Sequence, residues 1–93
     1  MIRFSDKIKT KLADRNISRL EVEQCFFNVE GNYLDDTRAQ HKTDPTTKWF
    51  VAETDKGRRL KIMFVPRDDG VDIKSAYDST EEVWRMYQRN AHC

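Results

Sequence analysis

The chain has 93 residues, a length that predicts one domain with one modest core and excludes a second domain within these residues. Its 17 basic and 16 acidic side chains give a net charge of +1, which excludes a global field that attracts nucleic acid. Aromatic residues make up 11% of the chain. Disordered chains have few aromatic residues, so this content excludes a disordered chain.

Two helices are predicted at the start of the chain. Ser5 is placed to cap a first helix that runs to about Arg15, whose narrow apolar stripe recurs every four residues at Phe4, Ile8 and Leu12. Ser18 and Glu21 have the spacing of a capping box, which predicts a second helix with its apolar face at Val22, Cys25, Phe26 and Val29. Gly31 is typical of the residue that follows a helix end.

Three strands joined by two tight turns are predicted over residues 47–77. They cover 49–54, 59–65 and 71–77, and the turns contain Gly57 and Gly70. The middle strand is apolar at nearly every position, which is typical of a central strand. Alternation predicts one buried face with Phe50, Leu60, Ile62, Phe64, Ile73 and Ser75, and an opposite face with Trp49, Arg59, Lys61, Met63 and Lys74.

A short edge strand within 32–36 precedes this meander, and a last helix follows it. Ser79 and Glu82 repeat the capping-box spacing, so this helix is expected to start near Ser79 and to run to about Asn90. The sequence therefore predicts a single α+β domain over 1–93. An antiparallel sheet, made of a three-stranded meander and a short edge strand, packs with two N-terminal helices and one C-terminal helix.

Several classes of site are not indicated by the sequence. Cys25 and Cys93 lack any paired spacing, which favours reduced thiols and a cytoplasmic protein. No apolar run approaches membrane-spanning length, and charge precedes any apolar run at the start, so neither a membrane segment nor a signal peptide is expected. No pair of Cys and His has ligand spacing, so we predict no metal and no cofactor.

One local cluster of cations is a candidate binding surface. The dense run of positive charge is Lys56, Arg58, Arg59 and Lys61 around the first turn. Of these, Arg59 and Lys61 are expected to share a sheet face with Lys74 of the neighbouring strand. Cations beside an exposed aromatic ring form a platform for phosphate binding and base stacking, for which Trp49, Tyr77 and Tyr87 are the candidate rings. A second interpretation explains these residues about as well. The cations lie on an ordinary solvated surface and bind no ligand, and the two tyrosines belong to the core with their hydroxyls in water.

The chain also resembles a known family over about residues 36–90. The matching runs are Trp-Phe-Val-Ala at 49–52, Gly-Arg-Arg-Leu at 57–60, Phe-Val at 64–65 and Ile-Lys-Ser-Ala-Tyr at 73–77. They resemble the BrnT-like toxins of bacterial type II toxin–antitoxin systems. This resemblance implies a RelE-like fold, metal-independent RNA cleavage and a small DNA-binding antitoxin as partner. Three positions that are usually arginine in the family hold Trp49, Asp72 and Tyr77 here.

Roles for single residues follow from this resemblance. Cleavage by attack of the RNA 2′-hydroxyl on the adjacent phosphate would use Arg59, Lys61 and Lys74 to stabilise charge on the phosphate. Proton transfer would fall to His41 or Tyr77. RNA or the partner would bind at Trp49, Arg58 and Tyr87.

A second hypothesis comes from another functional class. It is a non-catalytic protein-binding module on the same fold, for example a bacterial or phage-encoded inhibitor or regulator of a nucleic-acid-processing complex. The loss of the three family arginines favours this alternative.

Overall fold

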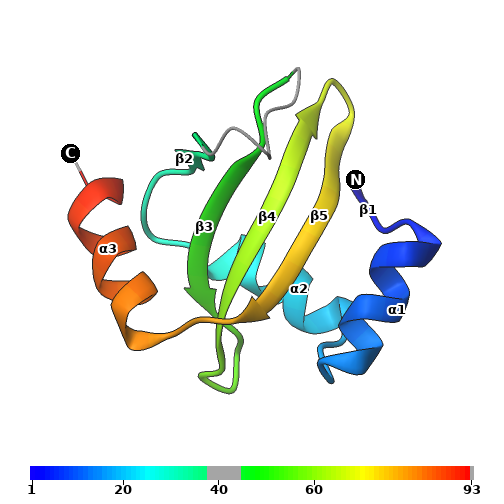
Figure 1. Ribbon diagram of the computed structural model, residues 1–93, viewed down its shortest axis with the longest axis horizontal. Coiled ribbons are helices and arrows are strands. Elements are labelled where there is room, and N and C mark those ends of the chain that lie inside the picture. Colours follow the sequence, from blue (N-terminus) through cyan, green and yellow to red (C-terminus); the bar gives the residue numbers. More distant parts are fainter. Residues whose placement is uncertain (38–44, 93) are drawn as a thin grey trace.

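The computed structural model describes residues 1–37 and 45–92. Within these ranges lie eight elements (Figure 1): β1 (Ile2–Arg3), α1 (Asp6–Asp14), α2 (Arg19–Asn28), β2 (Leu34–Asp35), β3 (Lys48–Glu53), β4 (Arg59–Arg67), β5 (Gly70–Asp78) and α3 (Glu81–Ala91). The described strands form one five-stranded sheet in the order β1-β5-β4-β3-β2. The predicted α+β class, the three helices, the edge strand and the central position of the 59–65 strand are confirmed.

The first strand was not predicted, and it makes the sheet mixed rather than antiparallel throughout. β1 pairs with β5 in parallel, with Arg3 opposite Asp72, and the other pairings are antiparallel. The Val71 amide donates to the Met1 carbonyl at 2.9 Å. A Cβ at Gly70 would lie 1.9 Å from that carbonyl oxygen, so the close approach requires glycine. A strand of two residues is too short to leave a periodic pattern in the sequence.

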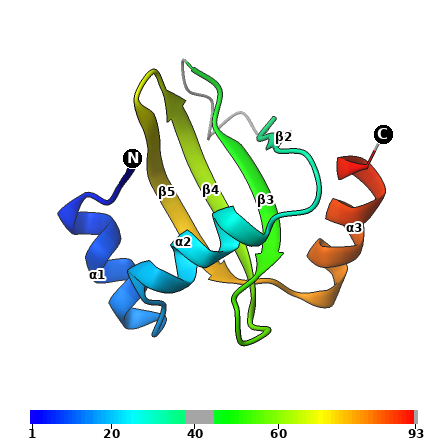
Figure 2. The same ribbon diagram turned by 180° about the vertical axis from the view of Figure 1, so that it is seen from behind.

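The core lies between α2 and one face of the sheet. α2 crosses this face in Figure 2, and α1 lies beyond the β5 side. The Phe26 ring of α2 lies 4.8 Å from the Phe50 ring and 5.3 Å from the Phe64 ring, in edge-to-face contacts. Leu60 and Ile62 of β4 are fully buried on the same face. The predicted core face of β3 and β4 is therefore confirmed.

A β-bulge in β5 changes the predicted faces of that strand. The register shifts between Met63 and Phe64, which leaves Lys74 as the extra residue on β5. As a result Ala76, opposite Ile62, is the fully buried residue. Ser75 lies opposite Met63 on the other face. The prediction that Ser75 shares the core face was wrong, because simple alternation does not account for an inserted residue.

The helix starts follow side-chain capping, with one correction. Ser5 caps α1, and Ser18 forms a capping box with Glu21 at the start of α2, as predicted. Thr80, not Ser79, caps α3, since its hydroxyl accepts from the Val83 amide.

Gly31 is needed for a different reason from the one predicted. α2 already ends at Asn28, and its C-cap residue Val29 is extended. A Cβ at Gly31 would lie 2.8 Å from both the Ala91 Cβ and the Tyr87 hydroxyl oxygen, so glycine here permits the close approach of α3.

We expect Phe64→Ala to lower the free energy of unfolding by roughly 3–5 kcal/mol, because it leaves a cavity between α2 and the sheet. Denaturant titration followed by circular dichroism measures this. Leu20→Ala is the control: Leu20 is 62% exposed, so its loss should change stability by less than about 0.5 kcal/mol. A loss below about 1 kcal/mol for Phe64→Ala would contradict the face assignment.

Candidate functional site

Among the described residues, no helix crosses one face of the sheet. It is the face toward the viewer in Figure 1, where α3 lies beside β3, α1 lies beside β5 and α2 passes behind the sheet. The strand register places these side chains on it: Trp49, Val51, Lys61, Met63, Ser75 and Tyr77. Trp49, Val51, Lys61 and Met63 are buried, and Ser75 and Tyr77 are half-buried, so Trp49 is not the exposed ring that the sequence predicted. We call these six residues the open face because none of the described helices crosses them.

Lys61 is the central charge of the open face. Its Nζ lies 4.5 Å from the centroid of the Trp49 ring and 5.6 Å from that of the Tyr77 ring. Two aromatic faces stabilise an ammonium group without neutralising it. Lys61 is only 8% exposed, and within 1–37 and 45–92 no carboxylate pairs with it.

Lys61 and Trp49 also line a pocket of about 650 Å³ between the sheet and α3. Its other walls come from the end of β2 and from α3, and they are Leu34, Asp35, Asp36, Thr37, Met86 and Asn90. The positive charge of Lys61 therefore borders a space large enough for a ligand group.

Arg15 adds a second cation to the open face, and sequence reasoning missed it. It follows α1, and its Nη1 donates to the Ser75 hydroxyl at 3.2 Å and to the Ala76 carbonyl at 3.0 Å. Its guanidinium carbon lies 5.6 Å from the centroid of the Tyr77 ring. Tyr77 is thus the ring shared by Arg15 and Lys61. The signal that would have found Arg15 is its position on the same helical row as Lys7 and Lys11, spaced by four.

Arg59 joins α3 to the sheet. Its guanidinium carbon lies 4.3 Å from the centroid of the Trp84 ring. Its nitrogens form ion pairs with Glu53 at 3.6 Å and with Glu81 at 3.3 Å. Two carboxylates therefore already balance the charge that the sequence analysis assigned to phosphate.

Arg58 connects its own turn to three other segments: the residues after α1, the start of α2 and the end of β5. It forms ion pairs with Asp78 at 2.8 Å and Glu21 at 3.2 Å. It also donates to the carbonyls of Asn16 at 2.7 Å and Arg15 at 3.1 Å. The hydrogen bonds to Asp78 raise the pKa of Arg58 above its ordinary value and lower the pKa of Asp78. This geometry gives Arg58 a structural position between the helices and the sheet.

The remaining predicted residues are spread over three places. Tyr87 is 2% exposed and donates to the Asn32 carbonyl at 2.9 Å, and burial raises its pKa to about 12. The Trp49 ring lies 5.7 Å from that of Tyr87, which places both rings where α3 packs on β3. Lys74 is exposed at the bulge and lines a separate pocket. His41 lies outside the described residues.

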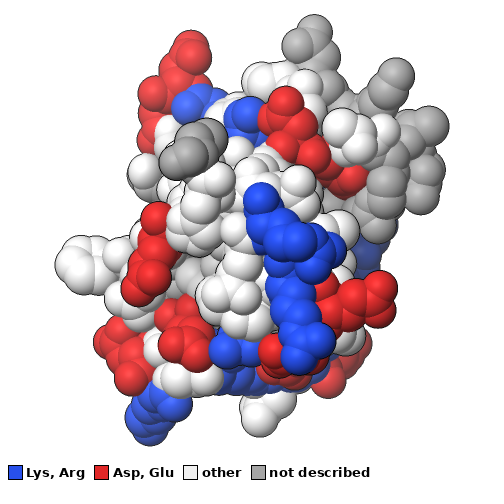
Figure 3. Space-filling view, turned by 90° about the vertical axis from the view of Figure 1, so that its left-hand side faces the viewer, with Lys and Arg blue, Asp and Glu red and all other residues white. Residues whose placement is uncertain are grey.

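Charge of both signs is mixed on the side of the molecule that carries α3. Figure 3 shows a short row of basic side chains there with acidic side chains around it. One of the α3 cations, Arg85, pairs with Glu81 at 3.5 Å.

Two further surveys cover the described ranges only. Among residues 1–37 and 45–92, no group of three His, Cys, Asp or Glu side chains is placed to hold a metal ion. In the same part of the chain, every helix is too short or too polar to traverse a bilayer.

Comparison with known proteins gave no relative. No family model, no curated protein and no solved structure matches the chain. Function is therefore inferred from the geometry of the open face and from the motifs of the sequence.

Cys25 is expected to be chemically inert in the folded protein. It is fully buried, its thiol donates to the Ala52 carbonyl at 3.5 Å, and burial raises its pKa to about 12. In a Cys93→Ser background, iodoacetamide should label Cys25 only after denaturant is added, as measured by mass spectrometry. Labelling of the native protein at the denatured rate would contradict the burial of this thiol.

Acid should weaken the Arg58 network. The pKa values of Glu21 and Asp78 are lowered in the folded state, Glu21 mainly by the Ser18 amide and Asp78 by Arg58. Their stabilisation is therefore complete above the ordinary carboxyl pKa of about 4 and is lost as the pH falls through the lowered values. We expect the Tm to fall with acid in this range. Arg58→Gln should have a lower Tm at neutral pH and a shallower acid decline.

Arg89→Gln is the matched control for this experiment. It removes one exposed positive charge from α3, and no ion pair of Arg89 is found among the described residues. Its Tm curve against pH should run parallel to that of the parent protein. Parallel curves for Arg58→Gln as well would refute the coupling of Arg58 to these carboxylates.

Proposed function

We propose that this protein is a metal-independent ribonuclease toxin with a RelE-like fold, and that RNA binds across the open face of the sheet. The observation that carries this proposal is the ammonium of Lys61, held between two aromatic rings without a carboxylate partner among the described residues. Burying an unpaired ammonium is costly, so an anionic ligand would stabilise this arrangement. A phosphate flanked by bases supplies both the charge and the flat surfaces that rings prefer.

The residues around Tyr77 suit cleavage by the RNA itself. The 2′-oxygen attacks the adjacent phosphorus, the new bond closes a cyclic phosphate, and the bond to the 5′-oxygen breaks. Lys61 and Arg15 stabilise the negative charge that builds on the phosphate oxygens. The Tyr77 hydroxyl, whose ring lies near both cations, gives its proton to the 5′-oxygen as the bond to that oxygen breaks. His41 is the candidate that accepts the proton of the 2′-hydroxyl.

Arg15 offers a replacement for one of the three arginines that the resemblance leads one to expect and that this chain lacks. Tyr77 occupies one of those three positions, and the guanidinium of Arg15 lies over its ring. We infer that α1 supplies the positive charge that this position of β5 lacks. Asp72, at another of the three, is paired with Arg3 and Arg67 and takes no part in the proposed chemistry.

The proposed setting is the cytoplasm of a bacterium or of a phage-infected cell. The net charge of +1 gives no long-range attraction for RNA, so binding depends on the local cations, and message already held on a ribosome is the favoured substrate. A small protein antitoxin that covers the open face would block the proposed site directly.

A non-catalytic protein-binding module is the second candidate, and one observation favours it. Phe27 is 90% exposed and Leu20 is 62% exposed. They are seven residues apart, so they share the outer face of α2. Large apolar side chains on one exposed stripe are typical of a surface that contacts another protein.

Lys61→Met tests the proposal, since it removes the charge and keeps the apolar stem. We expect induced expression of the parent to arrest growth and the purified parent to cleave RNA. Lys61→Met should lower the cleavage rate about 100-fold or more, the usual effect of losing one group that stabilises transition-state charge. Its Tm should stay within a few degrees of the parent's.

Lys56→Met is the matched control, because Lys56 is an exposed lysine in the turn before β4. It should cleave RNA as the parent does. Equal cleavage by Lys61→Met and the parent would show that the open face is not the active surface. A parent that neither arrests growth nor cleaves RNA, yet binds a protein through Leu20 and Phe27, would favour the binding module.

A further inference from the structure

We propose that a second surface, formed by α1, β1 and β5, binds the phosphates of a single RNA strand that continues from the open face. This inference rests on the proposed function and extends it from one phosphate to a track along α1. We call this surface the α1 track and define it by Lys7, Lys11, Arg15 and Lys74.

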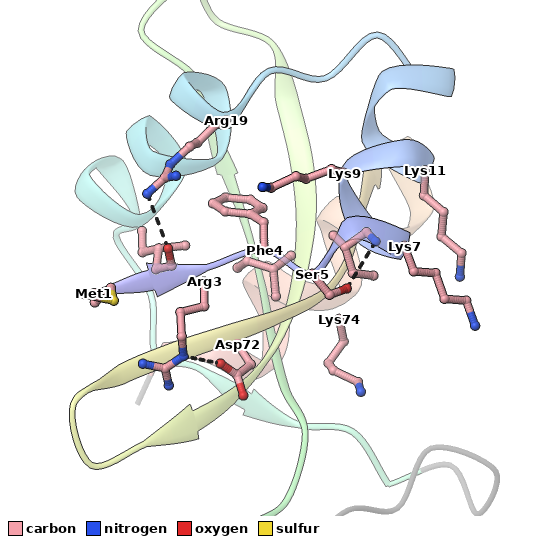
Figure 4. A pocket seen from close by; sticks show the side chains of 13 residues that line it. Met1, Arg3, Phe4, Ser5, Lys7, Lys9, Lys11, Arg19, Asp72 and Lys74 are labelled. Atoms are coloured by element: carbon pink, nitrogen blue, oxygen red, sulfur yellow. Dashed lines mark hydrogen bonds and ion pairs between the residues drawn. The ribbon is translucent and has the colours of Figure 1, made fainter.

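A pocket of about 880 Å³ lies at the start of the α1 track (Figure 4). Six of its lining residues are basic and one, Asp72, is acidic; the basic ones are Arg3, Lys7, Lys9, Lys11, Arg19 and Lys74. Its remaining walls are mostly apolar and come from Ile2, Phe4, Ile8 and Ile73. An excess of like charge over an apolar floor attracts an anion.

Three of these cations already have acidic partners. Arg3 pairs with Asp72 at 2.6 Å and with Asp69 at 2.9 Å. Arg19 pairs with Glu23 at 3.2 Å, and Lys9 lies 4.0 Å from Asp6. These contacts leave a distinct subset of the basic residues for an external ligand.

That subset is Lys7, Lys11 and Lys74. All three are exposed, and no ion pair of theirs is found within residues 1–37 and 45–92. In Figure 4 their ammonium groups extend to one side of the pocket, away from the ion pair of Arg3 and Asp72. The bulge of β5 is what inserts Lys74 at this point.

The same row of charge leads to the open face. Lys7, Lys11 and Arg15 are spaced by four and therefore lie on one side of α1. From Lys7 to Arg15 the helix rises about 12 Å, which is more than the spacing of neighbouring phosphates along a strand. Arg15 ends the row over the Tyr77 ring, which is also next to Lys61. A strand that reaches Lys61 can therefore place further phosphates along α1.

Single-stranded RNA fits this track better than an acidic peptide does. The cations follow one another along the helix, as phosphates do along a strand, and the row ends at the half-buried ring of Tyr77, which offers a base a surface for stacking. An acidic peptide would use the cations but leave this ring without a partner.

The test compares two charge-matched double variants by RNA affinity. Lys7→Gln with Lys11→Gln removes two charges from the α1 track, and Lys56→Gln with Arg89→Gln removes two exposed charges elsewhere. Each pair changes the net charge from +1 to −1, that is +1 − 2. The probes are fluorescent RNAs of about four and about twelve nucleotides, with 2′-O-methyl groups that prevent cleavage.

We expect the α1 variant to weaken binding of the long RNA only. Its slope of log affinity against log salt should fall in magnitude by about 1.4, because each lost phosphate contact contributes about 0.7 for a single strand. The control pair should keep the parent's slope. With cleavable long RNA, the α1 variant should raise KM and leave kcat unchanged.

Each other outcome overturns a defined part of the argument. Equal slopes for the parent and both variants, or an equal loss in both variants, would overturn the α1 track and leave the open face intact. A parent that binds neither RNA would overturn the ribonuclease proposal and the track together. Displacement of the long RNA by oligoglutamate at equal residue concentration would overturn the assignment to RNA.

Discussion

The position of Arg58 is the constraint on which the candidate site depends. A guanidinium group offers five N–H donors in a fixed plane, and here they reach two carboxylates and two backbone carbonyls. The partners come from three parts of the chain that are distant in sequence: Arg15 and Asn16 after α1, Glu21 in α2, and Asp78 at the end of β5. Because the end of α1 is fixed against β5 in this way, the side chain of Arg15 reaches Ser75 and the ring of Tyr77.

The two types of basic residue are used differently in this fold. The arginines at the junctions between elements, Arg3, Arg58, Arg59 and Arg67, are neutralised by carboxylates. Four lysines differ from them, because no ion pair of theirs is found among the described residues: Lys7 and Lys11 of α1, Lys61 of the open face and Lys74 of β5. Lys9 and Lys48 do have acidic partners, Asp6 and Asp35. The planar fork of arginine suits fixed bidentate contacts, and a mobile ammonium suits a ligand that comes and goes. A nearly neutral protein can thus present a local excess of positive charge.

The sequence predicted what depends on near neighbours in the chain. The capping residues Ser5 and Ser18 correctly predicted the starts of two helices, and the glycine-containing turns correctly predicted the three-stranded meander. The two residues of β1 left no periodic signal. The bulge at Lys74 depends on how β5 pairs with β4, which no local pattern specifies.

The candidate site was predicted only in part, for the same physical reason. Lys61 stood out as the one charge in an apolar strand, and the register then brought Trp49 and Tyr77 to it. Arg58 and Arg59 are adjacent in sequence, yet they pair with different distant carboxylates: Arg58 with Asp78, 20 residues away, and Arg59 with Glu81, 22 residues away. Arg15 joins the site across 61 residues. Such contacts come from tertiary structure and not from local spacing.

The placement of the two tryptophans provides an optical probe of this protein. Trp49 lies under the ammonium of Lys61, and Trp84 lies under the guanidinium of Arg59. A cation close to an indole ring alters its excited state, so the emission of each tryptophan depends on where its cation lies. In a Trp84→Phe protein the remaining emission comes from Trp49 alone, and a ligand that draws Lys61 away changes it without any attached dye. The reverse variant, Trp49→Phe, reports whether α3 stays docked on the sheet through Arg59.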